Sequence, residues 1–125
     1  MKRLASAAAL AATSPLAAST IDLGWMDEIP SEYRGRWDSN AAACAGAPGR
    51  QRVELGADRL KVGGDPFRAE SIGWDSQGGV MVHSRYAGPG KAWARYDHFY
   101  LSEDRRTMVR FREYRSYPLV RCVGR

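Results

Sequence analysis

The sequence has few of the residues that usually carry catalysis or bind metals. It contains two histidines and two cysteines in 125 residues. No G-x-S-x-G nucleophile motif occurs, and no helix-forming segment follows the glycine pairs at 63–64 and 78–79, so neither resembles a phosphate-binding loop. The apolar run near the N-terminus is too short to span a bilayer, and no comparable run follows it. We therefore expect a binding protein rather than an enzyme, with no cofactor, no metal and no membrane span.

The N-terminus is typical of a secretory signal peptide. MKRLASAAALAATSPLAAS places two cations before an uncharged apolar run, and then a proline and small residues. Ala17 and Ser19 favour cleavage before Thr20. The sequence thus predicts a signal peptide over 1–19 and a periplasmic or secreted protein.

The remaining chain is long enough for one small domain. We expect an N-terminal extension over 20–28 and a single barrel domain over 29–125, present as a monomer. Removal of Lys2 and Arg3 with the signal leaves 17 basic and 14 acidic side chains, a formal charge of +3. Sixteen of the 19 basic residues in the full sequence are arginines. A charge this close to balance disfavours nucleic acid as the partner.

Cys44 and Cys122 lie near the two ends of the predicted domain. An exported protein meets an oxidising environment, so we expect them to form an intramolecular disulfide. The alternatives, a reactive thiol or a metal site, lack a second cysteine or histidine at ligand spacing. A loop of this length predicts a stabilisation of roughly 4–5 kcal/mol in the chain-entropy model.

Short β-rich segments separated by glycine, proline and aspartate make up most of the chain. This rhythm predicts an all-β fold, a small antiparallel meander barrel of about eight strands, with a short helical turn before the first strand. Residues 40–49 are expected to form a loop or one helical turn. The expected strands cover 33–37, 51–55, 59–63, 67–74, 79–86, 92–101, 107–114 and 118–123.

The expected hairpin of Ala92–Leu101 and Arg106–Tyr114 is specified well enough for its two faces to be assigned. If Leu101 is opposite Arg106, alternation places one set of side chains on each face of the pair. The more apolar set is expected to face the core, and it comprises Ala94, Tyr96, His98 and Tyr100 with Thr107, Val109, Phe111 and Glu113. The other set is then expected to form a solvated charged lattice of Arg95, Asp97, Arg110 and Arg112.

The two histidines are expected to be too far apart to share a metal. A turn at 87–90 places His83 opposite Ala94, about 13 Å from His98 at strand rise. His98 is expected to be a hydrogen-bonded core residue. His83 is expected near Glu70, as a surface pair or a pH-sensitive contact.

The segment Gly35-Arg36-Trp37 resembles the Gly-x-Trp of the first strand of lipocalin-like barrels, the calycins. In that family a helical turn precedes the strand, and an arginine from the last strand stacks on the tryptophan. Pro30-Ser31-Glu32 would supply the turn and Arg121 the arginine, so the resemblance implies a structural signature of Gly35, Trp37 and Arg121. Over Ile29 to Cys122 the chain also resembles small exported bacterial two-cysteine proteins of unknown function.

A weaker likeness is to periplasmic inhibitors of animal-type lysozyme, which carry a Ser-Gly-x-Arg/Lys-Tyr loop. Residues that echo this loop are candidates for partner binding: Ser84, Arg85, Tyr86, Lys91 and Trp93. The alternatives to a binder of a protein or an envelope polymer are therefore a hydrolase inhibitor and a lipocalin-like carrier of small ligands. Thirteen aromatic residues would fill a narrow barrel, which disfavours the carrier.

Overall fold

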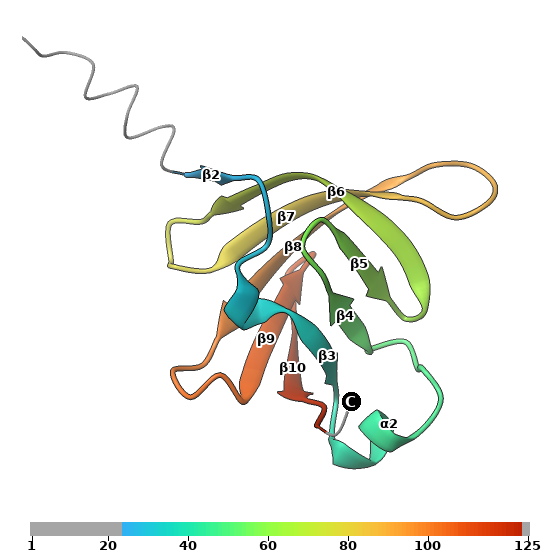
Figure 1. Cartoon of the computed structure of the whole chain (residues 1–125), viewed down its shortest axis with the longest axis vertical. Helices are drawn as coiled ribbons and strands as arrows, with labels where there is room; N and C mark the ends of the chain where they lie inside the picture. The colour runs from blue at the N-terminus through green and yellow to red at the C-terminus, as the bar shows by residue number, and fades with distance from the viewer. Residues whose placement is uncertain (1–23, 124–125) are drawn as a thin grey trace, which may run out of the picture.

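The computed structural model describes residues 24–123, which form an antiparallel sheet closed into a barrel (Figure 1). Eight strands follow one another around the barrel, and the last of them, β10, pairs with the first, β3. The barrel strands are β3 (Gly35–Asp38), β4 (Val53–Leu55), β5 (Arg59–Val62), β6 (Asp65–Trp74), β7 (Val80–Tyr86), β8 (Ala94–Leu101), β9 (Thr107–Arg112) and β10 (Arg115–Arg121). The predicted fold class is confirmed.

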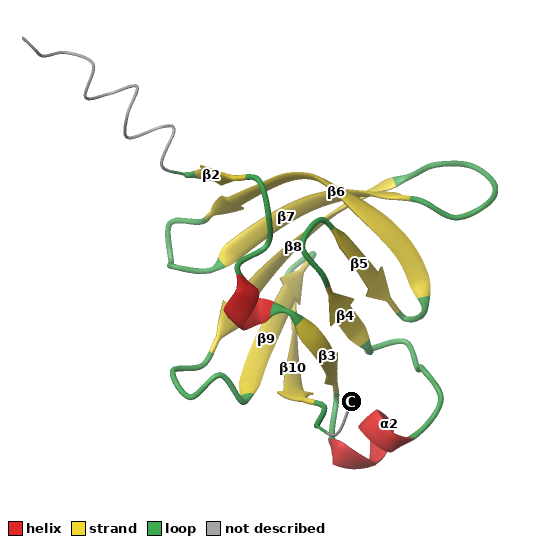
Figure 2. Ribbon diagram, in the orientation of Figure 1, coloured by secondary structure: helices red, strands yellow, loops and turns green. Residues whose placement is uncertain are grey.

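Little of the described chain is helical (Figure 2). The 3₁₀ turn η2 (Ser31–Tyr33) precedes β3, as expected, and α2 (Ala41–Ala45) follows it. Asn40 caps α2, because its side-chain oxygen accepts a hydrogen bond of 2.8 Å from the amide of Ala43. Arg52 holds the other end of α2 by donating from Nη2 to three carbonyl oxygens, those of Ala43, Cys44 and Gly46.

The predicted N-terminal extension contributes a ninth strand. β2 (Trp25–Met26) pairs with the second half of β6 and lies outside the ring of eight. Trp25 lies opposite Gly73, where an added Cβ would come within 3.2 Å of the indole. The bare glycine therefore allows the indole to lie close to the backbone of β6. The predicted signal peptide, 1–19, falls outside the described residues.

The assignment of the two hairpin faces was wrong. Arg95, Asp97 and Arg110 are buried inside the barrel, whereas Tyr96 and Phe111 are exposed on its outer face. The register is also shifted by two residues from the expected one, because Leu101 pairs with Met108. A count of apolar side chains could not find this arrangement, since the buried charges compensate one another.

Asp97 is the centre of that buried cluster and has no exposed surface. Its carboxylate accepts a hydrogen bond of 2.8 Å from Arg95 Nε and one of 2.9 Å from Arg110 Nη1. The guanidinium carbon of Arg95 lies 5.1 Å from the ring centre of Phe67, and that of Arg110 lies 4.5 Å from the ring centre of Tyr117. Charge pairing and aromatic contacts together make the burial of these ions tolerable.

The rest of the interior is apolar. Its fully buried large side chains include Trp37, Phe67, Phe99 and Met108. These residues and the charged cluster occupy the interior of the barrel. The expectation that aromatic residues would occupy a narrow barrel therefore holds in part, with an ionic cluster beside them.

The positions of the two histidines also differ from the prediction. His83 lies opposite Tyr96, rather than Ala94, and His98 lies opposite Met81. Both residues point away from the core, on neighbouring positions of the outer face, so the separation of about 13 Å was wrong. His98 is hydrogen-bonded as expected, but to Asp75 on the outside of the barrel.

Candidate functional site

One end of the barrel is closed by the contact that the Gly-x-Trp resemblance implied. The guanidinium carbon of Arg121 lies 4.3 Å from the ring centre of the buried Trp37. Arg121 also donates hydrogen bonds of 2.7–2.9 Å to backbone oxygens of Glu32, Arg34 and Arg105. Gly35 has a φ of 123°, and a Cβ there would lie 3.2 Å from Arg121 Nη1. This glycine is therefore needed for both its conformation and its size.

The disulfide ties the C-terminal end of the barrel to α2. Cys44 and Cys122 are bonded at 2.03 Å, which confirms the predicted pair. Arg52, which holds the end of α2, also forms a buried ion pair of 2.9 Å with Asp38. The disulfide and this ion pair fix α2 against β3. They are structural features and leave no reactive cysteine.

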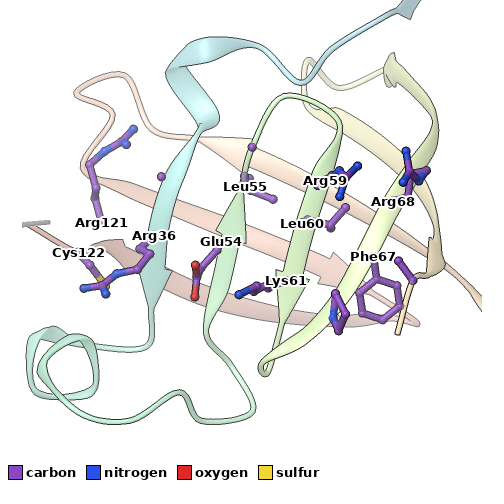
Figure 3. A pocket seen from close by; sticks show the side chains of 14 residues that line it. Arg36, Glu54, Leu55, Arg59, Leu60, Lys61, Phe67, Arg68, Arg121 and Cys122 are labelled. Atoms are coloured by element: carbon purple, nitrogen blue, oxygen red, sulfur yellow. The ribbon is translucent and has the colours of Figure 1, made fainter. Parts of the chain in front are cut away.

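The outer face of β3–β6 carries a groove of about 570 Å³. Figure 3 shows its lining, which comes from four consecutive strands and the end of β10. One side of the groove is formed by residues that pair across neighbouring strands: Arg36, Glu54, Lys61 and Pro66. Arg59 and Arg68, also cross-strand partners, lie on the other side. Leu55, Leu60 and Phe67 lie between these two sides of the groove.

The charge of the groove is strongly one-sided. Five of its lining residues are cationic, namely Arg36, Arg59, Lys61, Arg68 and Arg121, and Glu54 is the single carboxylate among them. Arg121 is engaged at the barrel end. Within residues 24–123, Arg36, Lys61 and Arg68 form no ion pair, and the buried Nε of Arg36 has no hydrogen-bond partner. An anion placed in this groove would meet several cations that the fold does not use.

The five candidate partner-binding residues do not form one surface. Ser84 has no exposed surface and faces the interior, so it cannot contact a partner. Arg85 is exposed and pairs with Glu70 at 2.8 Å. Trp93 is 42% exposed, and its ring stacks on that of Tyr86 at 5.8 Å. Lys91 lies in the exposed β7–β8 connection.

A polar cluster lies on the outer face at the β6–β7 turn. The carboxylate of Asp75 accepts a hydrogen bond of 2.7 Å from Tyr100 and lies 2.9 Å from Nδ1 of His98. Burial opposes the ionisation of Asp75, but hydrogen bonds from His98, Tyr100 and the amides of Gly79 and Gln77 outweigh it and lower its pKa to about 2. Burial and the same carboxylate raise the pKa of Tyr100 to about 12. The cluster holds a turn in place and presents no nucleophile.

His83 lies in a second surface cluster. Its ring stacks on Tyr96 with 4.3 Å between centres, and its Nδ1 lies 3.9 Å from Glu70. The expected proximity of His83 and Glu70 is therefore confirmed. A hydrogen bond from Arg85 lowers the pKa of Glu70. Across the part of the chain that the structure describes, no three His, Cys, Asp or Glu side chains are grouped closely enough to hold a metal ion.

No protein-family model, curated protein or solved structure matches this chain. Between residues 24 and 123, none of the helices has the length and apolar character needed to cross a membrane. The groove is therefore the main guide to function.

Sequence reasoning did not identify this groove, although a signal for it was present. Gly63 and Gly64 have φ values of 62° and 91° and join β5 to β6 as a two-residue turn. Such a turn pairs Val62 with Asp65 and hence Arg59 with Arg68. Counting outward from the glycine pair would have revealed two arginines side by side.

Proposed function

We propose that the protein is an exported binding protein and that its ligand is an anion bound in the groove on β3–β6. The observation that carries this proposal is the lining of the groove, with five cationic residues and one carboxylate. Export rests on the predicted signal peptide, and the disulfide is compatible with it. The bound anion would neutralise Arg36, Lys61 and Arg68, which have no ion-pair partner within the described residues.

The two alternative functions have less support. A carrier of the lipocalin type holds its ligand inside the barrel, and this interior is occupied by Trp37, Phe67, Phe99 and the Asp97 cluster. An inhibitor that acts through Ser84, Arg85 and Tyr86 would need them in an accessible loop. They lie in the middle and at the end of β7, and Ser84 is buried. A cationic groove would also repel cationic lysozymes at long range.

The proposal can be tested by mapping where a small anion binds. Trigalacturonate, which carries three carboxylates, is titrated into the isotopically labelled mature protein, and amide chemical shifts are followed by NMR. We expect the largest shifts at the groove residues of β3–β6. In the variant Arg36→Glu/Lys61→Glu the affinity should fall at least tenfold.

The matched control is Arg115→Glu, which reverses a charge at an exposed position outside the groove. Its affinity for trigalacturonate should equal that of the unmodified protein. Absence of binding, or shifts spread evenly over the surface, would refute the groove as the binding site.

A further inference from the structure

A row of three arginines crosses the outer face beside the groove. Arg59 on β5 lies directly opposite Arg68 on β6, and Arg68 lies directly opposite Arg85 on β7. Their neighbours Leu60, Phe67 and Ser84 are buried in the interior, so alternation directs the three arginines outward. All three are exposed. The sheet therefore presents three guanidinium-bearing side chains at intervals of about 4.8 Å between strands.

This arrangement is unfavourable for the isolated protein. Like charges directly opposite each other destabilise a pair of strands. Arg85 is compensated by Glu70, which the β-bulge between Ala69 and Ser71 releases from the regular ladder. Arg59 has only Asp58, at 3.9 Å, and Arg68 in the middle forms no ion pair with any residue from 24 to 123. The uncompensated repulsion would be relieved by a ligand with several negative charges.

The row lengthens the site beyond a small molecule. Arg59 and Arg68 already line the groove, and Arg85 continues the line on the next strand. From β3 to β7 the cationic surface covers four strand spacings, roughly 19 Å at about 4.8 Å each. A single sugar acid or phosphate would fill a fraction of this length, whereas a linear polymer with a charge on each unit would occupy all of it.

A partly exposed tryptophan lies at the far end of the row, where β8 begins. Arg85 pairs with Ala94, and the preceding residue, Trp93, is partly exposed and packs against both Tyr86 and Phe67. Because Arg85 and Ala94 face outward, alternation turns Tyr86 and Trp93 to the inner side of the sheet, so the indole covers the rim of the barrel and does not extend the arginine row. The predicted export of the protein favours an acidic envelope polysaccharide over a nucleic acid, and each carboxylate of such a polymer can pair with a guanidinium.

From these features, and on the basis of the function proposed above, we infer that the ligand is a linear acidic polysaccharide. It lies across β3–β7 and is bound by the row Arg59–Arg68–Arg85. Its carboxylates pair with the row and with the groove cations. Affinity should therefore increase with chain length until the whole row is covered.

The experiment compares galacturonate oligomers of different length. The dissociation constants of trigalacturonate and decagalacturonate are measured for the mature protein by calorimetry at fixed ionic strength. We expect the decamer to bind at least tenfold more tightly per chain than the trimer. Arg85→Gln, which lies outside the groove, should remove most of this difference and leave trimer binding unchanged.

Arg112→Gln is the matched control, because Arg112 likewise pairs with a surface carboxylate, that of Glu113 at 3.3 Å. It should leave both oligomers unaffected. If the trimer binds and the decamer binds no better, the polymer inference is wrong and the groove proposal stands. If neither binds, both are wrong. Tighter binding of polyglutamate, polyphosphate or single-stranded RNA than of polygalacturonate at equal charge would overturn the choice of polysaccharide.

Discussion

The arginines inside the barrel and those on its outer groove differ in what surrounds them. Each buried arginine has its charge engaged: Arg95 and Arg110 share Asp97, and Arg52 binds Asp38. On the groove, Arg36 and Arg68 form no ion pair within the described chain. The same residue type thus serves the fold where a partner is built in, and remains available for binding where none is.

Removing the shared partner of the inner arginines should have the largest effect. Asp97→Ala leaves two guanidinium groups buried with no carboxylate, so we expect a loss of about 3–5 kcal/mol in the free energy of unfolding. Urea denaturation followed by tryptophan fluorescence measures it. Replacing the whole cluster, as Arg95→Met/Asp97→Leu/Arg110→Met, should restore most of the stability. If Asp97→Ala is as stable as the unmodified protein, the charges of Arg95 and Arg110 do not depend on Asp97 for their burial.

A smaller, pH-dependent effect is expected at Asp75. Its pKa is lowered from 3.8 to about 2 in the folded protein. The resulting stabilisation, about 2 kcal/mol, is fully present above pH 4 and is lost as the pH falls towards 2. Asp75→Asn should therefore be less stable than the unmodified protein at pH 6, and the gap should close by pH 2. Denaturation curves at several pH values test this, and a gap independent of pH would contradict it.

A substitution in the outer row Arg59–Arg68–Arg85 should have the smallest effect on stability, and it should stabilise the protein. Arg68→Gln removes a charge that lies between two others, so we expect a gain of about 0.2–1 kcal/mol at low salt. High salt should abolish the gain, because exposed charges are screened. The control variant Arg50→Gln, at an exposed position outside the strands, should show no gain. Thermal melting at two salt concentrations separates these outcomes, and a destabilised Arg68→Gln would remove the argument that the row is costly.

Local sequence signals were enough to predict the order of strands. Alternating β-rich segments and glycine turns located all eight barrel strands, and the presence of two cysteines behind a predicted signal peptide predicted the disulfide. The resemblance around Trp37 implied its contact with Arg121. The strands depend on periodicity within single segments, the disulfide on there being just two cysteines, and the Trp37–Arg121 contact on a family resemblance.

The faces and the groove needed information that no segment contains. Asp97 can be buried because Arg110, on another strand, reaches it. A hydropathy pattern scores each charge separately and so places them all in solvent. The groove likewise exists only once β3, β4, β5 and β6 are in register, since its cations come from each strand except β4 and from β10.

The junction between β3 and β10 has a consequence for how the chain folds. Every other ladder of the barrel joins strands that follow one another in sequence, and even the longest of these connections, residues 39–52 between β3 and β4, is much shorter than the chain between β3 and β10. β3 and β10 meet across just two residue pairs, and Arg121 and the disulfide lie at the same junction. We expect the meander to form first and this junction to close last. In the reduced protein, the amides of β3 and β10 should then exchange with solvent before those of the other strands.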